Sequence, residues 1–85
     1  MPRQTYVVEY EYAQPLTDAL HDEEARRTDP CLKQYGVTWV QSLLASDRMK
    51  MICQFEAESA EQIRDALRSA SVSFSRVWPA IKYQR

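Results

Sequence analysis

The sequence of 85 residues is poor in glycine, cysteine and histidine, with one, two and one of each, and has no long apolar run. A single glycine excludes collagen-like and low-complexity chains. Cys31 and Cys53 form no CxxC pair, so we expect neither a disulfide framework nor a zinc knuckle. No apolar run approaches the roughly 20 residues that cross a bilayer, and the first residues have no apolar signal-peptide core. We therefore expect a cytoplasmic protein with no membrane span.

The chain also has little net charge, with 11 Lys and Arg residues against 12 Asp and Glu residues. Domains that bind nucleic acid are usually basic, so the sequence predicts no nucleic-acid partner. Apolar residues are plentiful, at 45%, and the length suits a single domain over residues 1–85. A domain this small buries only about 60–65% of its unfolded surface. A metal, a disulfide or a partner chain would therefore help to stabilise it.

Hydrophobic spacing predicts six elements. Alternation with a period of two predicts strands over residues 5–12, 37–44, 49–56 and 74–83, and helical spacing predicts helices over 17–35 and 59–70. We expect the first helix to run to about Thr28 and to kink or restart at Pro30, because proline disfavours helical geometry in the preceding residue. Gly36, the only glycine, is expected to end this helix in a left-handed conformation.

The order strand, helix, strand, strand, helix, strand predicts an α+β fold. Its simplest form is the ferredoxin-like βαββαβ plait, a four-stranded antiparallel sheet with both helices on one face. Pro79 removes a hydrogen-bond donor from the last strand, which should therefore lie at an edge of the sheet. Cys53 alternates with Met51 and Phe55, so we expect it to be a small residue of the core.

The sheet face without helices is too apolar for full exposure to water. Val7 and Ile52 fall on this outer face, together with one apolar face of the strand at 37–44. That strand would contribute one of two pairs, either Trp39 with Leu43 or Val40 with Leu44. An exposed apolar patch of this kind usually marks an interface.

We therefore predict a homodimer packed sheet against sheet, with a monomer that exposes its outer face as the alternative. The two sheets would enclose a semi-polar space that serves as the dimer interface or as a ligand cavity. The residues expected to line it are Glu9, Glu11, Trp39, Lys50 and Gln54.

His21 is the only histidine and therefore the only candidate imidazole ligand for a metal ion. Asp18 lies three residues before it and Glu24 three residues after it, which places the three side chains on one arc of the predicted helix. An imidazole and two carboxylates can bind a divalent transition metal. A solvated acidic helix face is the alternative. His21 could also act as a general base, although no nucleophile or glycine-rich loop accompanies it in the sequence.

Four segments together resemble a small bacterial family described as a domain of unknown function, or as nickel-binding protein-like. They read GVTWVQS from residue 36, SD from 46, CQFEA from 53 and EQIR from 61, and the resemblance runs from about Thr5 to Lys82. It implies a ferredoxin-like domain that forms dimeric α+β barrels, and a relation to nickel. His21 lies in the first helix, where the resemblance would place an imidazole ligand.

Three functions remain open at this point. The first is a non-enzymatic binding protein that holds a divalent transition metal, nickel being the one that the resemblance implies. The second is a structural or regulatory module that docks on a larger assembly, a protein partner, through its sheet face or edge strand. The third is a cofactor-free enzyme that uses a cavity of the α+β barrel, an analogy at the level of the fold. We prefer a binding protein to an enzyme.

Overall fold

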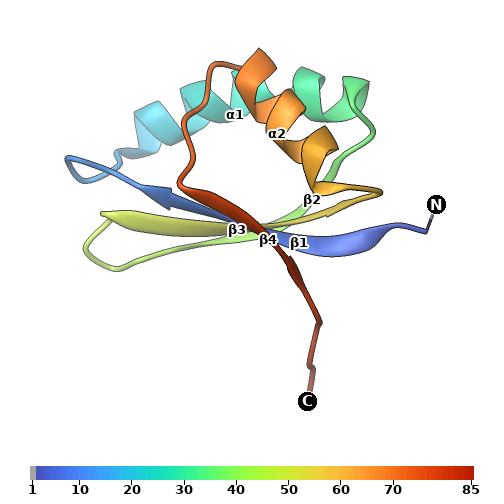
Figure 1. The fold of residues 1–85 in the computed structure, drawn as a ribbon. Helices are drawn as coiled ribbons and strands as arrows, with labels where there is room; N and C mark the ends of the chain where they lie inside the picture. Colours follow the sequence, from blue (N-terminus) through green and yellow to red (C-terminus); the bar gives the residue numbers. More distant parts are fainter. Residues whose placement is uncertain (1) are drawn as a thin grey trace.

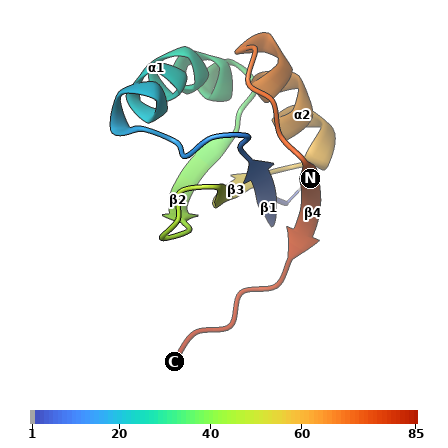
Figure 2. The same cartoon turned by 90° about the vertical axis from the view of Figure 1, so that its left-hand side faces the viewer.

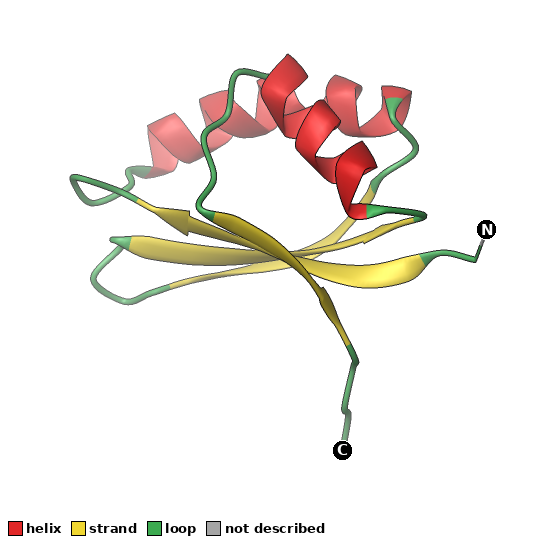
Figure 3. Cartoon of the chain, viewed as in Figure 1, coloured by secondary structure: helices red, strands yellow, loops and turns green. Residues whose placement is uncertain are grey.

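Six elements follow one another in the computed structural model, which describes residues 2–85 (Figure 1). In chain order they are β1 (Gln4–Glu11), α1 (Asp18–Gln34), β2 (Thr38–Leu44), β3 (Lys50–Ala57), α2 (Ala60–Ser69) and β4 (Arg76–Ala80). The four strands pair antiparallel in the order β2-β3-β1-β4, and both helices cover one face of the sheet (Figure 3). The predicted ferredoxin-like α+β fold is therefore confirmed.

The core lies between the sheet and the two helices. Alternate residues of the two central strands face it: Tyr6, Val8 and Tyr10 of β1, and Met51, Cys53 and Phe55 of β3. β4 lies at the edge beside β1, in agreement with the missing donor of Pro79. Among residues 2–85, no helix is both long enough and apolar enough to cross a membrane.

Helix α2 is apolar on the side that faces the sheet. It begins with a capping box, in which the Ser59 hydroxyl and the Gln62 side chain each accept a hydrogen bond from the other residue's backbone N–H. Ile63, Ala66 and Leu67 follow at helical spacing and are fully buried. α2 therefore packs closely on its part of the sheet.

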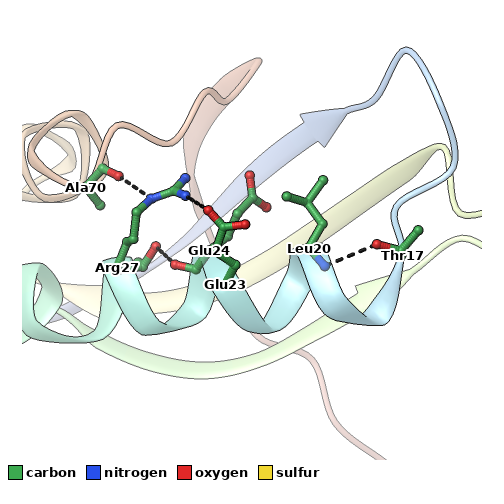
Figure 4. Close-up of polar contacts among 7 residues, drawn as sticks. Thr17, Leu20, Glu23, Glu24, Arg27 and Ala70 are labelled. Atoms are coloured by element: carbon green, nitrogen blue, oxygen red, sulfur yellow. Dashed lines mark hydrogen bonds and ion pairs between the residues drawn. The ribbon is translucent and has the colours of Figure 1, made fainter.

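Of the predicted kink or restart at Pro30, the restart is wrong, because helix α1 runs through Pro30 as a single helix. A proline inside a helix removes one backbone hydrogen bond and destabilises the helix. Contacts with α2 hold α1 in place: Arg27 donates a hydrogen bond of 3.1 Å to the backbone carbonyl of Ala70 (Figure 4). Tertiary contacts of this kind can outweigh a local preference.

Gly36 follows the end of α1 with a φ of +71°. The backbone N–H of Val37 donates to the carbonyl of Leu32. This is the left-handed helix end that the sequence predicts, and it turns the chain directly into β2.

Strand β2 contains a β-bulge that the sequence analysis did not predict. Trp39 lies opposite Phe55, whereas Gln41 lies opposite Gln54, so Val40 is an extra residue on this strand. A bulge shifts the alternation of side chains by one position.

Because of the bulge, neither predicted outer pair of β2 is correct. Trp39 lies on the helix-facing side, and Leu43 lies on the outer face opposite Ile52. Val40 lines the outer face, and Leu44 is opposite the buried Met51 on the inner side. The pairs were predicted wrongly because strict alternation was assumed along the whole strand.

Candidate functional site

A cavity of about 170 Å³ lies between α1 and the helix-facing side of the sheet. Figure 2 shows α1 on the β2 side of the sheet and α2 on the β4 side. The sheet contributes Tyr10, Trp39, Ser42, Met51, Cys53 and Phe55 to the cavity wall. Helix α1 contributes His21, Glu24, Ala25, Thr28, Asp29 and Leu32. The cavity therefore has a mostly apolar sheet wall and a mostly polar helix wall.

The polar wall explains why α1 does not close on the sheet. The inward stripe of α1 contains Glu24 and Thr28 at the helical spacing where α2 carries fully buried apolar residues. Pressing a carboxylate onto an apolar surface would remove it from water without a partner, which costs free energy. The side chains of this stripe therefore keep a space open beneath α1.

Glu24 is a half-buried carboxylate without a partner in the described part of the chain. Its backbone carbonyl accepts a hydrogen bond from the Thr28 hydroxyl, but no hydrogen bond or ion pair within residues 2–85 reaches its side chain. Its neighbour Glu23, in contrast, forms an ion pair with Arg27, with 2.7 Å between nitrogen and oxygen (Figure 4). One carboxylate of this adjacent pair is matched by a cation, and the other faces the cavity.

The charge of Glu24 acts on the polar groups of the sheet wall. Burial raises the pKa of Tyr12 to about 12, and the charge of Glu24 adds to the rise. Burial likewise raises the pKa of Tyr10 and of Cys53 above their ordinary values, and Glu24 contributes to both. Glu24, Tyr10 and Cys53 also line the same cavity.

Cys53 is hydrogen-bonded on the sheet wall of the cavity. The Ser42 hydroxyl donates to its sulfur over 2.7 Å. Burial raises the pKa of the Cys53 thiol, and the hydrogen bond from Ser42 lowers it by less. The expectation that Cys53 is a core residue is confirmed by its burial.

The three predicted metal ligands are divided between two places. His21 and Glu24 line the cavity together. The Asp18 carboxylate is bound instead to the guanidinium of Arg48, with 2.5 Å between oxygen and nitrogen, and it does not line the cavity. Across residues 2–85 no group of three or more His, Cys, Asp or Glu side chains is arranged to hold a metal ion. Arg48 lies in the turn after β2, far from Asp18 in sequence, which is why the sequence analysis missed this pair.

Four of the five residues predicted for the dimer or ligand cavity lie on the outer face of the sheet. They are Glu9, Glu11, Lys50 and Gln54. The fifth, Trp39, lies on the opposite face and lines the cavity beneath α1, so its predicted placement is wrong.

Several polar groups of the outer face pair within one copy of the chain. The Trp78 indole donates to the Glu9 carboxylate over 2.6 Å, and Gln41 donates to the Gln54 side-chain oxygen over 3.0 Å. Pairing of this kind lowers the cost of covering the face with another surface.

Apolar side chains are exposed beside these pairs. Leu43 is 61% exposed and Ile52 is 41% exposed, and the two lie opposite each other on neighbouring strands. Residues 81–85 extend past β4 on the side away from the helices (Figure 2), and Ile81 and Tyr83 there are 83% and 91% exposed. A groove of about 720 Å³ lies between this tail and the sheet.

The family described as nickel responsive protein SCO4226-like matches residues 6–79 of the chain. The chain belongs to this family. A crystal structure of SCO4226 from Streptomyces coelicolor A3(2) has the same fold, with a TM-score of 0.83 at 12% sequence identity. The match covers 94% of this chain and 99% of that one. The predicted resemblance to a nickel-related bacterial family is thereby confirmed.

A second solved structure, of an unknown protein from Galdieria sulphuraria, matches this SCO4226-like chain with a TM-score of 0.61 and 17% identity. The match covers 98% of this chain and 48% of that one, so this chain spans about half of that protein's length. No match was found among curated proteins. At these identities, the two structures support the fold alone.

Proposed function

We propose that this SCO4226-like protein is a non-enzymatic binding protein whose ligand occupies the cavity beneath α1. The observation that carries the proposal is Glu24, a half-buried carboxylate without a partner in the described chain, placed against the aromatic and sulfur-containing wall of a 170 Å³ cavity. An interior that served stability alone would fill or close such a space. Sites for small ligands typically combine apolar walls with a few polar groups of this kind.

The state of Cys53 supports binding rather than catalysis. Burial raises the pKa of this thiol, so it stays protonated at neutral pH, whereas the thiolate is the nucleophilic form. The hydrogen bond that it accepts from Ser42 holds it as part of the wall.

Cavity filling tests the binding function. The probes are benzylammonium, benzyl alcohol and benzoate, each with one aromatic ring, and the readout is the fluorescence of Trp39 in a Trp78→Phe background. We expect at least one probe to bind and Ala25→Leu to abolish its binding, because Ala25 lines the cavity. Ala19→Leu is the control, since Ala19 is exposed on the same helix and does not line the cavity. Failure of all three probes at millimolar concentration, or undiminished binding to Ala25→Leu, would overturn the proposal.

Nickel is the second candidate ligand, because the family description names a nickel response and because His21 and Glu24 line one cavity. Nickel is commonly held by imidazole and carboxylate groups. These two side chains alone do not fit a complete nickel site, since Asp18 is bound to Arg48. Calorimetry with Ni²⁺, Co²⁺ and Zn²⁺ tests this candidate. Heat of binding that disappears in His21→Ala would support it, and no heat above buffer for any of the three ions would end it.

The proposal also includes a homodimer that covers the outer sheet face with a second copy of the chain. It is supported by the exposed Leu43 and Ile52, and by a tail whose exposed Ile81 and Tyr83 could pack across a partner. Docking of the same face on another protein is the alternative. Sedimentation of the purified protein at micromolar concentration distinguishes them, because a monomer alone would exclude the homodimer.

A cytoplasmic location is proposed as well, supported by two cysteines that are both free.

A further inference from the structure

The charged groups at the cavity beneath α1 are mainly of one sign. Glu24 and Asp29 line it, and no Lys or Arg side chain among residues 2–85 does. Two basic residues lie between them on α1: Arg26 is exposed and does not line the cavity, and Arg27 is bound to Glu23 and to the carbonyl of Ala70. A partly buried charge without a partner is unfavourable, and a bound cation would remove that cost.

His21 does not supply this missing cation. It lines the cavity, but its Nδ1 lies 3.7 Å from the carboxylate of Asp22, with which it pairs when it is protonated. Within residues 2–85, His21 therefore forms an ion pair with Asp22 and none with Glu24.

Three hydrogen-bond donors of the cavity wall are already in use. The Trp39 indole donates to the Ser42 hydroxyl over 2.9 Å, and Ser42 donates to Cys53. The Thr28 hydroxyl donates to the carbonyl of Glu24. The Glu24 carboxylate, in contrast, is free to accept a hydrogen bond from a ligand, and an ionised carboxylate only accepts. An ammonium group would therefore find a charged acceptor there, whereas an anion would meet a charge of its own sign.

The sheet wall adds three aromatic rings, those of Tyr10, Trp39 and Phe55. The face of an aromatic ring attracts a cation within about 6 Å. The volume of about 170 Å³ also limits the ligand, because an apolar protein cavity of roughly 150 Å³ accommodates benzene.

We infer that the cavity beneath α1 takes a compact organic cation, a protonated amine or quaternary ammonium group on an apolar body about the size of one aromatic ring. The inference rests on the proposed binding function and names the chemical class of its ligand. The ammonium group lies against Glu24, and the apolar body contacts the rings and Met51 of the sheet wall.

The test compares three probes of similar size and different charge on the intact chain: benzylammonium, benzyl alcohol and benzoate. Trp39 fluorescence in the Trp78→Phe background reports their affinities. We expect benzylammonium to bind about tenfold more tightly than benzyl alcohol or better, as for a charge-assisted hydrogen bond with a cation–π contact. Benzoate should bind most weakly. Benzyl alcohol or benzoate binding as tightly as benzylammonium would overturn the inference and leave the binding function standing.

A pair of neighbouring variants then assigns the preference to one carboxylate. Glu24→Gln should reduce the advantage of benzylammonium over benzyl alcohol to less than about threefold, because the charge-assisted contact is lost. Glu23→Gln removes the same charge from the next residue, outside the cavity, and should keep the full preference. A preference that survives in Glu24→Gln, or is lost in Glu23→Gln, would contradict the assignment. If no probe binds to the parent chain, the binding function itself fails.

Discussion

Glu23 and Glu24 are the same residue type at adjacent positions, and their surroundings give them different roles. Glu23 lies on the exposed side of α1 and forms an ion pair with Arg27. Glu24 lies on the inward stripe, where its charge raises the pKa of nearby tyrosine and cysteine groups. The helical rotation of about 100° between successive residues is enough to separate a solvated ion pair from a site residue.

Tyr12 tests how a buried polar group near Glu24 affects the free energy of unfolding. Its hydroxyl is buried and has no hydrogen-bond partner in the described chain. Removing an unsatisfied buried hydroxyl avoids a desolvation cost of about 1–3 kcal/mol. We therefore expect Tyr12→Phe to leave the free energy of unfolding at pH 7 unchanged or to raise it by about 1 kcal/mol, measured by urea denaturation.

Tyr6→Phe is the comparison, because the Tyr6 hydroxyl donates a hydrogen bond of 3.4 Å to the side-chain oxygen of Gln4. It should lower the free energy of unfolding by about 1 kcal/mol. A larger loss in Tyr12→Phe than in Tyr6→Phe would contradict the assignment of the unsatisfied hydroxyl.

Tyr12 also makes the free energy of unfolding depend on pH in the alkaline range. Burial raises the pKa of Tyr12 from 10.0 to about 12, so between these values the folded state holds a proton that the unfolded state has lost. Raising the pH through this window therefore lowers the free energy of unfolding. Denaturation at pH 9 and at pH 11.5 should show this fall, with a smaller fall in Tyr12→Phe. An equal fall in both proteins would assign the effect to other groups.

At the scale of elements, α2 and α1 differ in how far local sequence determines them. The capping box at Ser59 and the apolar stripe that follows it are local signals, and they predict α2 correctly. α1 has a polar inward stripe and an interior proline, and both depend on neighbours that the local sequence does not reveal. The local rule for proline therefore predicts a kink or a restart at Pro30, whereas α1 continues through it as one helix.

Pro30 should therefore weaken α1 without breaking it. Pro30→Ala restores a backbone donor in the helix interior, where proline is about 3 kcal/mol less favourable than alanine. We expect the free energy of unfolding to rise by about 1–3 kcal/mol, as measured by thermal and urea denaturation.

Pro79→Ala is the comparison for this helix effect, because Pro79 lies in the edge strand β4. Proline is tolerated in edge strands, so this change should alter stability less than Pro30→Ala does. Unfolding free energies that decrease in Pro30→Ala would show that the proline stabilises α1.

At the scale of the whole molecule, helices cover one face of the sheet and leave the other to solvent or a partner (Figure 3). The outer face combines internally paired polar groups with exposed apolar side chains. Apolar surface removed from water by a second copy would contribute about 25 cal/mol per Å² to association. This arrangement is the reason to expect a dimer.

Leu43 is the residue that tests this expectation, because it is 61% exposed on the outer face, on the edge strand β2 opposite Ile52. Leu43→Asp should weaken dimerisation at least about tenfold in sedimentation experiments, since a charge would be buried without a partner. The control is Leu20→Asp, an exposed leucine on α1 that should leave the dimer intact. Removal of residues 81–85 should also weaken the dimer if the tail packs on the partner. A dimer unaffected by Leu43→Asp would place the interface elsewhere.

The sequence by itself determined the order of elements, the antiparallel sheet, the burial of Cys53 and the turn at Gly36. These follow from alternation, helical spacing and capping residues, which are patterns among residues close together in the chain. Only the tertiary structure decided the face of Trp39, the pairing of Asp18 with Arg48 and the position of Glu24 over the cavity. The reason is physical: one extra residue in β2 reverses a strand's faces, and an ion pair across 30 residues depends on how distant segments pack.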